Sequence, residues 1–571
     1  MNVMPFQPYE IDVVPNITGA TLASIDSEMF GQEKERLHIA HGEFGCLTIA
    51  LDNGKNYVVT KVELLSIVFD ALKPLEWIIQ NATYDIRQMR RFTPIEPRFI
   101  FDPMLVEKDL WGGYYLNFNL GAMVRRYLGL YVEKDKYEDI RTRTISNEVL
   151  YNYGVLDSVL ALRVALEQKK LLAENPWIRK VYETIDAPMI WVVLDMQPTR
   201  INVPGWLELA KENESKGKSI EAEIGLNVYS YVKVKERLAS ELGLHLESTE
   251  DETLAEYKQF PLIQQIREAR TYRKAASTYG EKWVASHVDE MGDVYCNWNV
   301  TGAETGRQSS SNPNLQNIPS RKMPIFRTFF VPRYGVHIIA DVSQQEPRLT
   351  ALVSKDKNLI GAFVNHEDIH TFVTRMIFED QSIVKADPRR KIGKETGLGV
   401  VYGLTAQGLT AKLKEVVDDP SMEINDEKSQ GYIDLYFQKF PRVKSMLDRV
   451  VADGHKNEFV TTYYGRRCWI NIHGYGWENN CKNSPIQGGG ADMTKMWQIK
   501  LWELCREQGV RYPMCLVVHD EIVLDVSPDE QDLYLGLLSA AFEQAITTLY
   551  PDSPVPFEFE HAEGQNWGAK K

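Results

Sequence analysis

Val336-His-Ile-Ile-Ala-Asp341 is an apolar, strand-like run that ends in a carboxylate at the point where a buried strand would emerge. The pattern returns in Cys515-Leu-Val-Val-His-Asp520-Glu521, within a predicted strand over residues 514–524. Carboxylates from two strands can hold a pair of divalent cations about 4 Å apart, which clamp the attacking and leaving oxygens of a phosphoryl transfer. Mg²⁺ suits such a site because it needs few carboxylates and keeps positions for substrate phosphates. For either run alone, an acid that caps a strand end is the simpler interpretation.

A helix is predicted between these two runs, and its spacing suits a nucleotide. Asp387-Pro388 is a plausible N-cap followed by proline in the first turn. Arg390, Lys394, Leu398 and Tyr402 then recur at every fourth position and share one slowly rotating face. The two cations could bind a triphosphate, and the apolar and aromatic residues could contact a base. An ordinary solvated amphipathic helix has the same spacing and stays open.

Three glycines, Gly393, Gly397 and Gly399, lie within this predicted helix. Each costs about 1 kcal/mol relative to alanine in a helix, so they indicate the close approach of another group or a bend. Gly393-Lys-Glu-Thr396 is not a phosphate-binding loop, because Pro388 stands where that motif requires glycine.

The N-terminal part carries three short acid motifs. Residues 21–25 form a strand-like run that leads into Asp26-Ser-Glu28, whose two acids point the same way on a strand. Asn81-Ala-Thr-Tyr-Asp85 and Tyr153-Gly-Val-Leu-Asp157 follow. Each motif alone is common, since Tyr-x-x-x-Asp is ordinary i, i+4 packing on a helix.

The distribution of elements predicts an α/β multidomain protein. Up to about residue 178, strand-like runs (46–51 and 56–60) alternate with helical ones (62–72 and 146–172). Asn175-Pro176 would separate this α/β domain from a mostly helical stretch over about 180–290. The remainder mixes strands with long helices.

The composition is that of an ordinary globular chain. The 571 residues carry a formal net charge of −14, which does not exclude a nucleic-acid partner because phosphate binding depends on local clusters of Lys and Arg. The six scattered cysteines form no CxxC pair, and the N-terminus lacks the order of a signal peptide. We therefore expect a cytoplasmic protein without a membrane span.

The C-terminal motifs together resemble those of family A DNA polymerases, the class of bacterial polymerase I and many phage enzymes, over residues 180–571. The matching blocks, in order, are Thr305-Gly-Arg-Gln-Ser-Ser-Ser-Asn-Pro-Asn-Leu-Gln-Asn-Ile-Pro319, Asp341-Val-Ser-Gln-Gln-Glu-Pro-Arg348, residues 390–403 and Val518-His-Asp-Glu521. Shorter matches are Asp368-Ile-His370, Tyr464-Gly-Arg-Arg467, Pro485-Ile-Gln487, Ala491-Asp492 and Asn566-Trp567. The three N-terminal motifs resemble those of the DnaQ-like 3′→5′ proofreading exonuclease that precedes the polymerase in this family.

The resemblance implies an RNase H-like exonuclease domain over residues 1–178 and a right-hand polymerase domain over 179–571. The thumb would cover about 190–297, the fingers about 354–454, and the palm about 298–353 and 455–571. This arrangement is similar to the large fragment alone and leaves no room for a 5′-nuclease domain. Its size and the Gln345-Glu346-Pro347 variant point to the phage type, in a bacterial cell or a phage-infected host.

The implied activity is template-directed addition of dNMP to a primer 3′-hydroxyl. Asp341 and Asp520 would hold two Mg²⁺ ions, for which Mn²⁺ could substitute, and Glu521 is a weaker candidate for the catalytic set. Arg390, Lys394 and His370 would bind the incoming dNTP through its triphosphate, and Lys394 could also protonate the leaving pyrophosphate.

The sugar and the base of the nucleotide would meet a second group of residues. Glu346 would exclude a ribose 2′-hydroxyl, and Tyr402 would stack near the nascent pair. Gln344 and Leu398 would complete the nucleotide site.

Primer–template DNA is the implied partner of a monomer that accessory replication proteins could assist. The predicted DNA contacts are Arg307, Asn314, Gln316, Asn317, Gln487, His519, Arg273 and Lys274. Further basic residues that could follow the phosphates are Arg270, Arg321, Lys322, Arg466 and Arg467, with a solvated surface as the alternative for each.

For proofreading, the resemblance implies that four acids hold two metals and that Tyr153 orients the attacking water. The four acids are Asp26, Glu28, Asp85 and Asp157. Asp102 matches a further recurrent acid and is interpreted as structural.

Several positions depart from the family pattern. Val342, Gln345 and Pro347 replace the usual Tyr, Ile and Leu, and Asn479 replaces a basic residue. Leu398 replaces an aromatic residue, which puts discrimination against dideoxynucleotides in doubt. None of these changes removes a predicted metal ligand, so we expect altered fidelity or sugar selectivity rather than inactivity.

Two alternatives remain open. A single-subunit RNA polymerase-like enzyme shares the palm and fingers plan, although Glu346 and the exonuclease motifs argue against it. A degenerate, DNA-binding scaffold would have lost a metal-binding acid.

Overall fold

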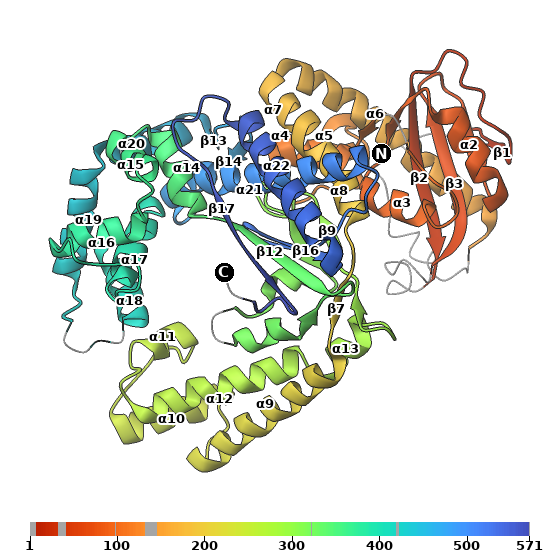
Figure 1. Cartoon of the computed structure of the whole chain (residues 1–571). Helices are drawn as coiled ribbons and strands as arrows, with labels where there is room; N and C mark the ends of the chain where they lie inside the picture. Colours follow the sequence, from red (N-terminus) through yellow and green to blue (C-terminus); the bar gives the residue numbers. More distant parts are fainter. Residues whose placement is uncertain are drawn as a thin grey trace.

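The computed structural model describes residues 7–31, 42–96, 99–131, 145–320, 323–417, 419 and 422–569. Figure 1 shows an α/β body formed by the N-terminal part, a central sheet with helices packed around it, and a helical arm that projects away from both. The chain is therefore of mixed α/β class, as predicted.

The N-terminal body is built on one mixed sheet of order β1-β4-β3-β2-β5-β6. Its strands are β1 (Glu10–Ile11), β2 (Leu22–Phe30), β3 (Glu43–Leu51), β4 (Asn56–Val59), β5 (Glu76–Ile78) and β6 (Ile100–Phe101). β2, β3 and β4 are antiparallel, whereas β5 runs parallel to β2 and β6. The predicted strands at 46–51 and 56–60 are thus confirmed.

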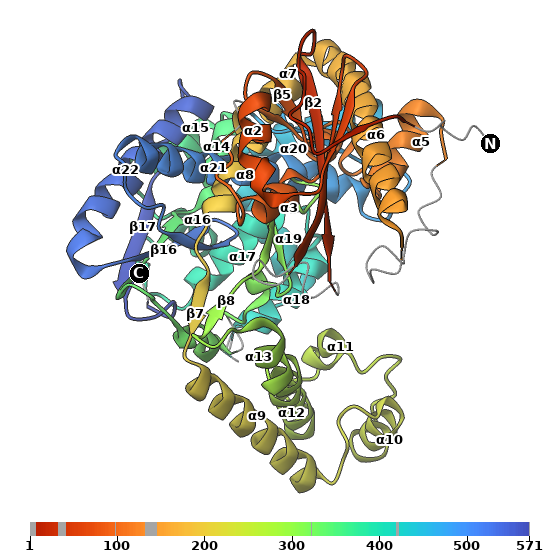
Figure 2. The same ribbon diagram turned by 90° about the vertical axis from the view of Figure 1, so that its right-hand side faces the viewer.

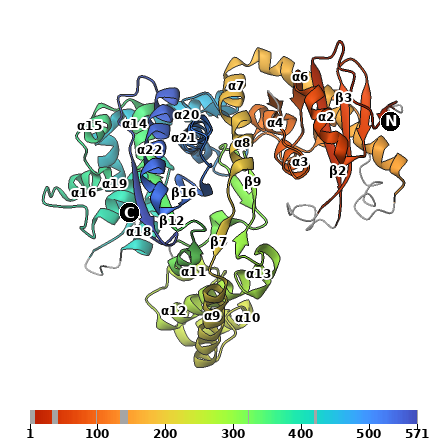
Figure 3. The same ribbon diagram turned by 45° about the vertical axis from the view of Figure 1, so that its right-hand side comes forward.

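Helices cover this sheet, as Figure 3 shows. They are the 3₁₀ turn η1 (Val62–Leu64), α2 (Leu65–Leu72), α3 (Ala82–Met89), α4 (Pro103–Trp111), α5 (Leu120–Leu128) and α6 (Asn147–Glu174). α6 packs against β2 and β3. It is also the one helix among the described residues that is long and apolar enough to cross a membrane by length and composition, and 56% of its apolar window is buried in the fold.

The predicted break at Pro176 is a junction of helices. α6 ends at Glu174, and α7 (Pro176–Val181), the π-helical turn η3 (Tyr182–Asp186) and α8 (Ala187–Asp195) follow without a linker. The Tyr182 hydroxyl accepts a hydrogen bond from the Asp102 backbone N–H (2.7 Å), so η3 is fastened to the N-terminal body.

The helical arm consists of α9 (Val203–Ile224), α10 (Tyr231–Leu242), α11 (Asp251–Ala255), α12 (Pro261–Thr278) and α13 (Glu281–His287). α9 and α12 pack along each other, and Figure 2 shows both extending away from the rest of the molecule. The outer part of the arm has a small core of its own, which includes Val228, Leu238 and Ile266. The helical character predicted for residues 180–290 is confirmed.

The central sheet has the order β15-β16-β12-β17. Its strands are β12 (Val336–Val342), β15 (Met514–Val518), β16 (Glu521–Val526) and β17 (Phe559–Gly564), and the long helices α21 (Trp477–Glu507) and α22 (Gln531–Leu549) pack together beside it. The prediction of a single strand over 514–524 was wrong. The chain reverses at His519, whose φ of +58° makes the turn, so that two strands form a hairpin.

A group of helices lies beside the central sheet, at the left of Figure 1. It comprises α14 (Gln345–Ser354), α15 (Lys357–Val364), α16 (Ile369–Phe378), α17 (Arg390–Val401), α18 (Ala406–Val416), α19 (Asp426–Lys439) and α20 (Pro441–Asn457). α17 begins later than predicted: Asp387 accepts a hydrogen bond from the Arg389 backbone N–H (2.9 Å) in the turn before the helix, and does not cap it.

Short strands connect these parts. They are β7 (Thr199–Ile201), β8 (Asp293–Val294), β9 (Asn297–Asn299), β10 (Ser309–Ser311), β11 (Phe330–Val331), β13 (Phe459–Thr461) and β14 (Arg467–Trp469). The six cysteines, all within the described residues, form no disulfide.

Arg466 joins the N-terminal body to the C-terminal part through a buried cluster of charges. Its guanidinium contacts Asp109 of α4 (2.8 Å), Asp186 of η3 (2.7 Å) and Asp492 of α21 (2.6 Å). Lys495 also binds Asp186, at 2.5 Å. The interpretation of Arg466 as a phosphate contact was therefore wrong, because its side chain is only 3% exposed and already holds three carboxylates.

Candidate functional site

The two acids predicted to bind metal lie close together on paired segments of the central sheet. β12 pairs with β16 so that Asp341 stands opposite Glu521, and the Val342 backbone N–H reaches the Asp520 carbonyl oxygen (3.4 Å). Asp341 is the penultimate residue of β12, and Asp520 lies in the turn that precedes β16. The hairpin thus brings the two predicted ligands from far apart in the sequence to one edge of the sheet.

Glu521, the weaker candidate, is engaged within the protein. Its Oε1 accepts a hydrogen bond from Trp567 Nε1 (2.7 Å) and a second one from Arg327 (3.3 Å). Neither Arg327 nor Trp567 received a role from the sequence. The Asn566-Trp567 motif was the only signal for either of them, and Arg327 gave none.

The cations predicted to bind a triphosphate converge where α16 meets α17. Arg390 makes a bidentate ion pair with Asp368 (2.8 and 2.7 Å), the residue that caps α16. Burial lowers the pKa of His370 to about 4. The charge of Asp368 opposes this shift, whereas the nearby charges of Arg390 and Lys394 add to it. At neutral pH His370 is therefore an uncharged hydrogen-bonding group.

Gly393 explains how the two helices come so close. A Cβ at this position would lie 2.2 Å from Thr374 Oγ1 and 2.5 Å from the His370 carbonyl oxygen. The predicted close approach is confirmed at this glycine.

Gln344 connects the end of β12 to α16. It adopts a left-handed conformation (φ +51°), its Oε1 accepts a hydrogen bond from the Ile369 backbone N–H (3.1 Å), and its Nε2 reaches Asp368 (3.5 Å). Its amide thus lies beside the cation cluster.

A polar network surrounds Glu346 on α14. Arg307 contacts the Glu346 carboxylate at 3.6 Å and donates a hydrogen bond to Gln487 at 3.3 Å. Burial, followed by the charge of Glu346, raises the pKa of Tyr402. Burial lowers the pKa of His519, with Arg307 among the neighbours that act in the same direction. These five residues, assigned separately from five sequence blocks, lie together.

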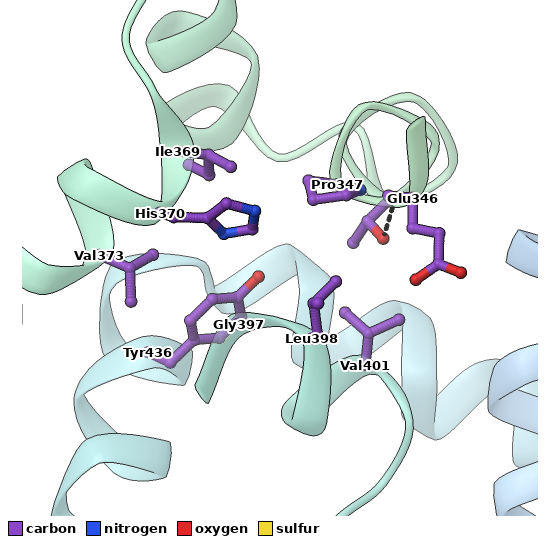
Figure 4. Close-up of a pocket in the computed structure, with 10 residues that line it drawn as sticks. Glu346, Pro347, Ile369, His370, Val373, Gly397, Leu398, Val401 and Tyr436 are labelled. Carbon is purple, nitrogen blue, oxygen red and sulfur yellow. Dashed lines mark hydrogen bonds between the residues drawn. The ribbon is translucent and has the colours of Figure 1, made fainter. Parts of the chain in front are cut away.

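Below Glu346 a small cavity of about 10 Å³ separates α14, α16, α17 and α19. Figure 4 shows His370, Leu398 and Tyr436 around it, with Pro347 at its upper side. Leu398 therefore lines the same cavity as Glu346 and His370.

The predicted DNA contacts around residues 314–317 support the local backbone. Asn314 Oδ1 accepts a hydrogen bond from the Gln316 backbone N–H (3.1 Å), and Gln316 Nε2 donates to the Val517 carbonyl oxygen (3.2 Å). The Asn317 carbonyl oxygen accepts from the Tyr279 hydroxyl (2.9 Å). The Gln316 bond attaches the segment to the hairpin that carries Asp520, and the Tyr279 bond attaches it to the end of α12.

The basic residues of the arm differ in their surroundings. Arg273 lies between Glu214 (3.5 Å) and Glu221 (3.3 Å) on α9, whereas Lys274 is exposed. Arg270 donates to the Val228 carbonyl oxygen (2.8 Å). Among the other predicted cations, Arg467 stacks on Phe459 and Trp469, and Arg321 and Lys322 lie outside the described residues.

In the N-terminal body, β2 and α6 bring acids and a tyrosine together. Asp26 and Glu28 are two residues apart on β2, so they point to the same face. Burial raises the pKa of Tyr153 on α6, and the charges of Asp157, Glu28 and Asp26 add to the effect. Four of the five residues predicted for the exonuclease are thus electrostatic neighbours.

Asp85 is held differently. Its Oδ1 accepts hydrogen bonds from the Ser27 backbone N–H (2.9 Å) and the Ser27 hydroxyl (2.5 Å), and burial raises its pKa to about 7. Asp102 caps both α3 and α4 through the N–H groups of Asn81, Ala82 and Met104, in keeping with a structural role.

The chemistry of the donors suits Mg²⁺, because each candidate site offers carboxylate oxygens from two acids. Within the part of the chain that the structure describes, no three His, Cys, Asp or Glu side chains are grouped closely enough to hold a metal ion. The fit therefore rests on two pairs of acids, Asp341 with Asp520 and Asp26 with Glu28.

Comparison with known proteins identifies relatives of the C-terminal part. The family model described as DNA polymerase family A matches residues 207–569. DNA polymerase I of Caldicellulosiruptor bescii is 31% identical over 440 residues, which cover 72% of this chain and 50% of that protein. DNA polymerase I of Streptococcus pneumoniae is 31% identical over 479 residues (75% and 52%), and the thermostable enzyme of Thermus aquaticus is 29% identical over 420 residues (68% and 48%). The chain spans about half the length of these relatives.

A solved structure extends the similarity of fold to nearly the whole chain. The POL domain of Pol1 from M. smegmatis, solved in complex with DNA primer-template and dNTP, superimposes with a TM-score of 0.82. The alignment covers 98% of this chain and 99% of that one. At 22% sequence identity, the similarity shows the fold alone.

Proposed function

Because this chain belongs to DNA polymerase family A, we propose that it extends a primer 3′-hydroxyl by template-directed addition of dNMP. The observation that carries this proposal is the pairing of β12 with β16, which brings Asp341 beside Asp520 and Glu521. Arg390 and Lys394 on α17, and His370 on α16, lie beside Gln344, which follows the end of β12.

Asp341 and Asp520 would hold two Mg²⁺ ions, which when bound lower the pKa of the primer hydroxyl and stabilise charge in the transition state. The protein's own contribution is to position and neutralise the nucleotide. Arg390 and Lys394 would bind the triphosphate, and neutral His370 would add a hydrogen bond. Arg390 would exchange Asp368 for phosphate oxygens, which offer the same bidentate geometry.

Sugar selection is assigned to Glu346. Its carboxylate lies between Arg307 and Tyr402, and Leu398 lines the adjoining cavity. Because polar neighbours fix the carboxylate, an added 2′-hydroxyl would have to displace one of them or remain unpaired at a cost of about 1–3 kcal/mol.

We also propose 3′→5′ proofreading by the N-terminal body. The neighbourhood of Tyr153 with Asp26, Glu28 and Asp157 supports it, since two metals held by such acids would generate hydroxide for hydrolysis. Asp85 would join them once its bond to Ser27 opens or is shared.

The proposed layout follows from these assignments. The exonuclease domain would cover residues 1–178, with the polymerase domain over 179–571. Within the polymerase domain the arm α9–α13 would be the thumb, α15–α20 the fingers, and the central sheet the palm. Primer–template DNA and dNTPs would be its partners in the cytoplasm.

The test is a gel assay on an end-labelled primer annealed to a longer DNA template with Mg²⁺, with and without dNTPs. We expect extension with dNTPs and stepwise shortening without them. Asp341→Ala should abolish extension alone, and Asp26→Ala should abolish shortening alone. An intact primer under both conditions would support the scaffold alternative, and a preference for ribonucleotides would support the RNA polymerase alternative.

A further inference from the structure

We propose that Trp567, near the C-terminus, is a positioning residue of the polymerase site. It would act by holding Glu521 and Arg327 in one fixed arrangement beside Asp341. The inference rests on the proposed polymerase activity, and it assigns Glu521 to support of the site rather than to metal binding.

Trp567 is itself firmly anchored. Its side chain is buried, with 2% of the residue exposed. Its backbone N–H donates to the Phe330 carbonyl oxygen (2.9 Å), and the two rings meet edge to face at 5.2 Å. The indole therefore has one position relative to β11.

The indole holds two charged side chains at once. Its Nε1 donates to Glu521 Oε1 at 2.7 Å, and the Arg327 guanidinium lies over the ring at 3.9 Å from the centroid. Arg327 donates to the same Glu521 oxygen (3.3 Å), which closes a triangle of contacts. Hydrogen bonds to a charged group are stronger than those between neutral groups, and the ring attracts the guanidinium as well.

The triangle lies directly beside the candidate metal-binding acids. Glu521 is the register partner of Asp341 and the chain neighbour of Asp520. Directly opposite residues of an antiparallel pair have Cβ atoms about 5 Å apart, so a displacement of Glu521 would move both acids. Three segments that are distant in the sequence, at residues 327, 521 and 567, thus fix one point of the site.

A packing anchor for the C-terminal segment is the competing explanation. The two explanations differ in what the indole N–H does. Trp567→Phe keeps a flat ring under Arg327 and against Phe330 but removes the donor to Glu521. A mere anchor would tolerate this change, whereas a positioning residue would not.

The chain offers a matched control in Trp502. Its Nε1 donates to Asp195 Oδ2 (2.7 Å), and Arg506 lies over its ring at 4.8 Å, so it repeats the triad of indole, carboxylate and guanidinium away from the site. Trp502→Phe removes an equivalent hydrogen bond.

Single-turnover incorporation of one dNTP is measured for the wild type, Trp567→Phe, Glu521→Gln, the double variant and Trp502→Phe. We expect Trp567→Phe to lower the maximal rate about tenfold or more, the effect of losing one hydrogen bond to a charged group, with the Kd for dNTP within about twofold. Its effect should largely disappear in the Glu521→Gln background, because interacting residues are not additive. Trp502→Phe should leave rate and Kd unchanged.

A second readout needs no activity. Phenylglyoxal modification of Arg327, followed by mass spectrometry of its peptide, should be slow in the wild type and in Trp567→Phe, and fast in Trp567→Ala. Equal labelling in all three proteins would contradict the triangle of contacts among Trp567, Glu521 and Arg327. An unchanged maximal rate in Trp567→Phe, or an equal loss in Trp502→Phe, would overturn the positioning role. If the wild type extended no primer, the proposed function would fail, and the labelling would still show whether Trp567 holds Arg327 in place.

Discussion

Replacing Arg466 by methionine should destabilise the protein severely. The guanidinium is buried and contacts Asp109, Asp186 and Asp492 at 2.6–2.8 Å. Methionine fills much of the volume but leaves three buried carboxylates, of which Asp186 keeps its ion pair with Lys495, with Lys108 as a further nearby cation. Breaking one buried pair in this way costs about 3–5 kcal/mol, so the loss should reach at least that range.

The loss should also depend on pH. Although burial opposes it, Arg466 and Lys495 lower the pKa of Asp186, whereas burial raises the pKa of Asp109. Burial raises the pKa of Asp109 and of Asp492 even beside Arg466, and the loss of the guanidinium removes a charge that lowers both pKa values. Such groups contribute stability at pH values below the unfolded pKa, and this contribution is lost as the pH rises through the folded pKa. The variant should therefore be most destabilised near pH 8 and less so near pH 5.

Urea unfolding at both pH values is followed by circular dichroism. Because the cluster joins α4 to α21, the loss of stability is measured from the first unfolding transition. Arg389→Met is the control, because Arg389 is partly exposed and pairs with Asp387 and Asp380 on the surface. Its loss should cost far less than that of Arg466, because solvent screens ion pairs at the surface. Equal losses in the two variants, or a loss in Arg466→Met that does not change with pH, would refute this reasoning.

Three further predictions concern the nucleotide site and its framework. Glu346→Ala should raise ribonucleotide incorporation relative to deoxyribonucleotide in a single-addition gel assay, and an unchanged ratio would exclude its role in sugar selection. Because the pKa of His370 lies near 4, His370→Gln should weaken dNTP binding equally at pH 6 and pH 8, and a difference that grows toward pH 6 would contradict a neutral imidazole. Gly393→Ala should cost about 1–3 kcal/mol in unfolding free energy, because its Cβ would collide with Thr374. Gly361→Ala on α15, where nothing lies within 4 Å of the added methyl group, should be neutral or slightly stabilising, and a similar loss in both would refute the contact.

The strongly patterned segments could be predicted from the sequence. The apolar run of β3 and the long helix α6 follow from periodicity alone. The acids of β12 and of the following hairpin were identifiable because each interrupts an apolar run. The turn at His519 was hidden, since a non-glycine residue adopts the left-handed conformation within continuous apolar sequence.

Other features depend on contacts between distant residues and left no local pattern. Arg466 has the sequence context of a surface cation, and only the fold surrounds it with carboxylates from three elements. The contact of Arg327 with Trp567 joins segments 240 positions apart in the chain, at residues 327 and 567. The bond between Asp85 and Ser27 likewise arises only when α3 packs beside β2.

The central claim is template-directed synthesis, and single-nucleotide addition tests it most directly. A primer is annealed to four templates that differ only in the first unpaired base, and each dNTP is supplied alone with Mg²⁺. We predict rapid addition of the complementary dNTP on every template, and none with Asp341→Ala. Addition that does not depend on the template base, or no addition on any of the four templates, would contradict the account.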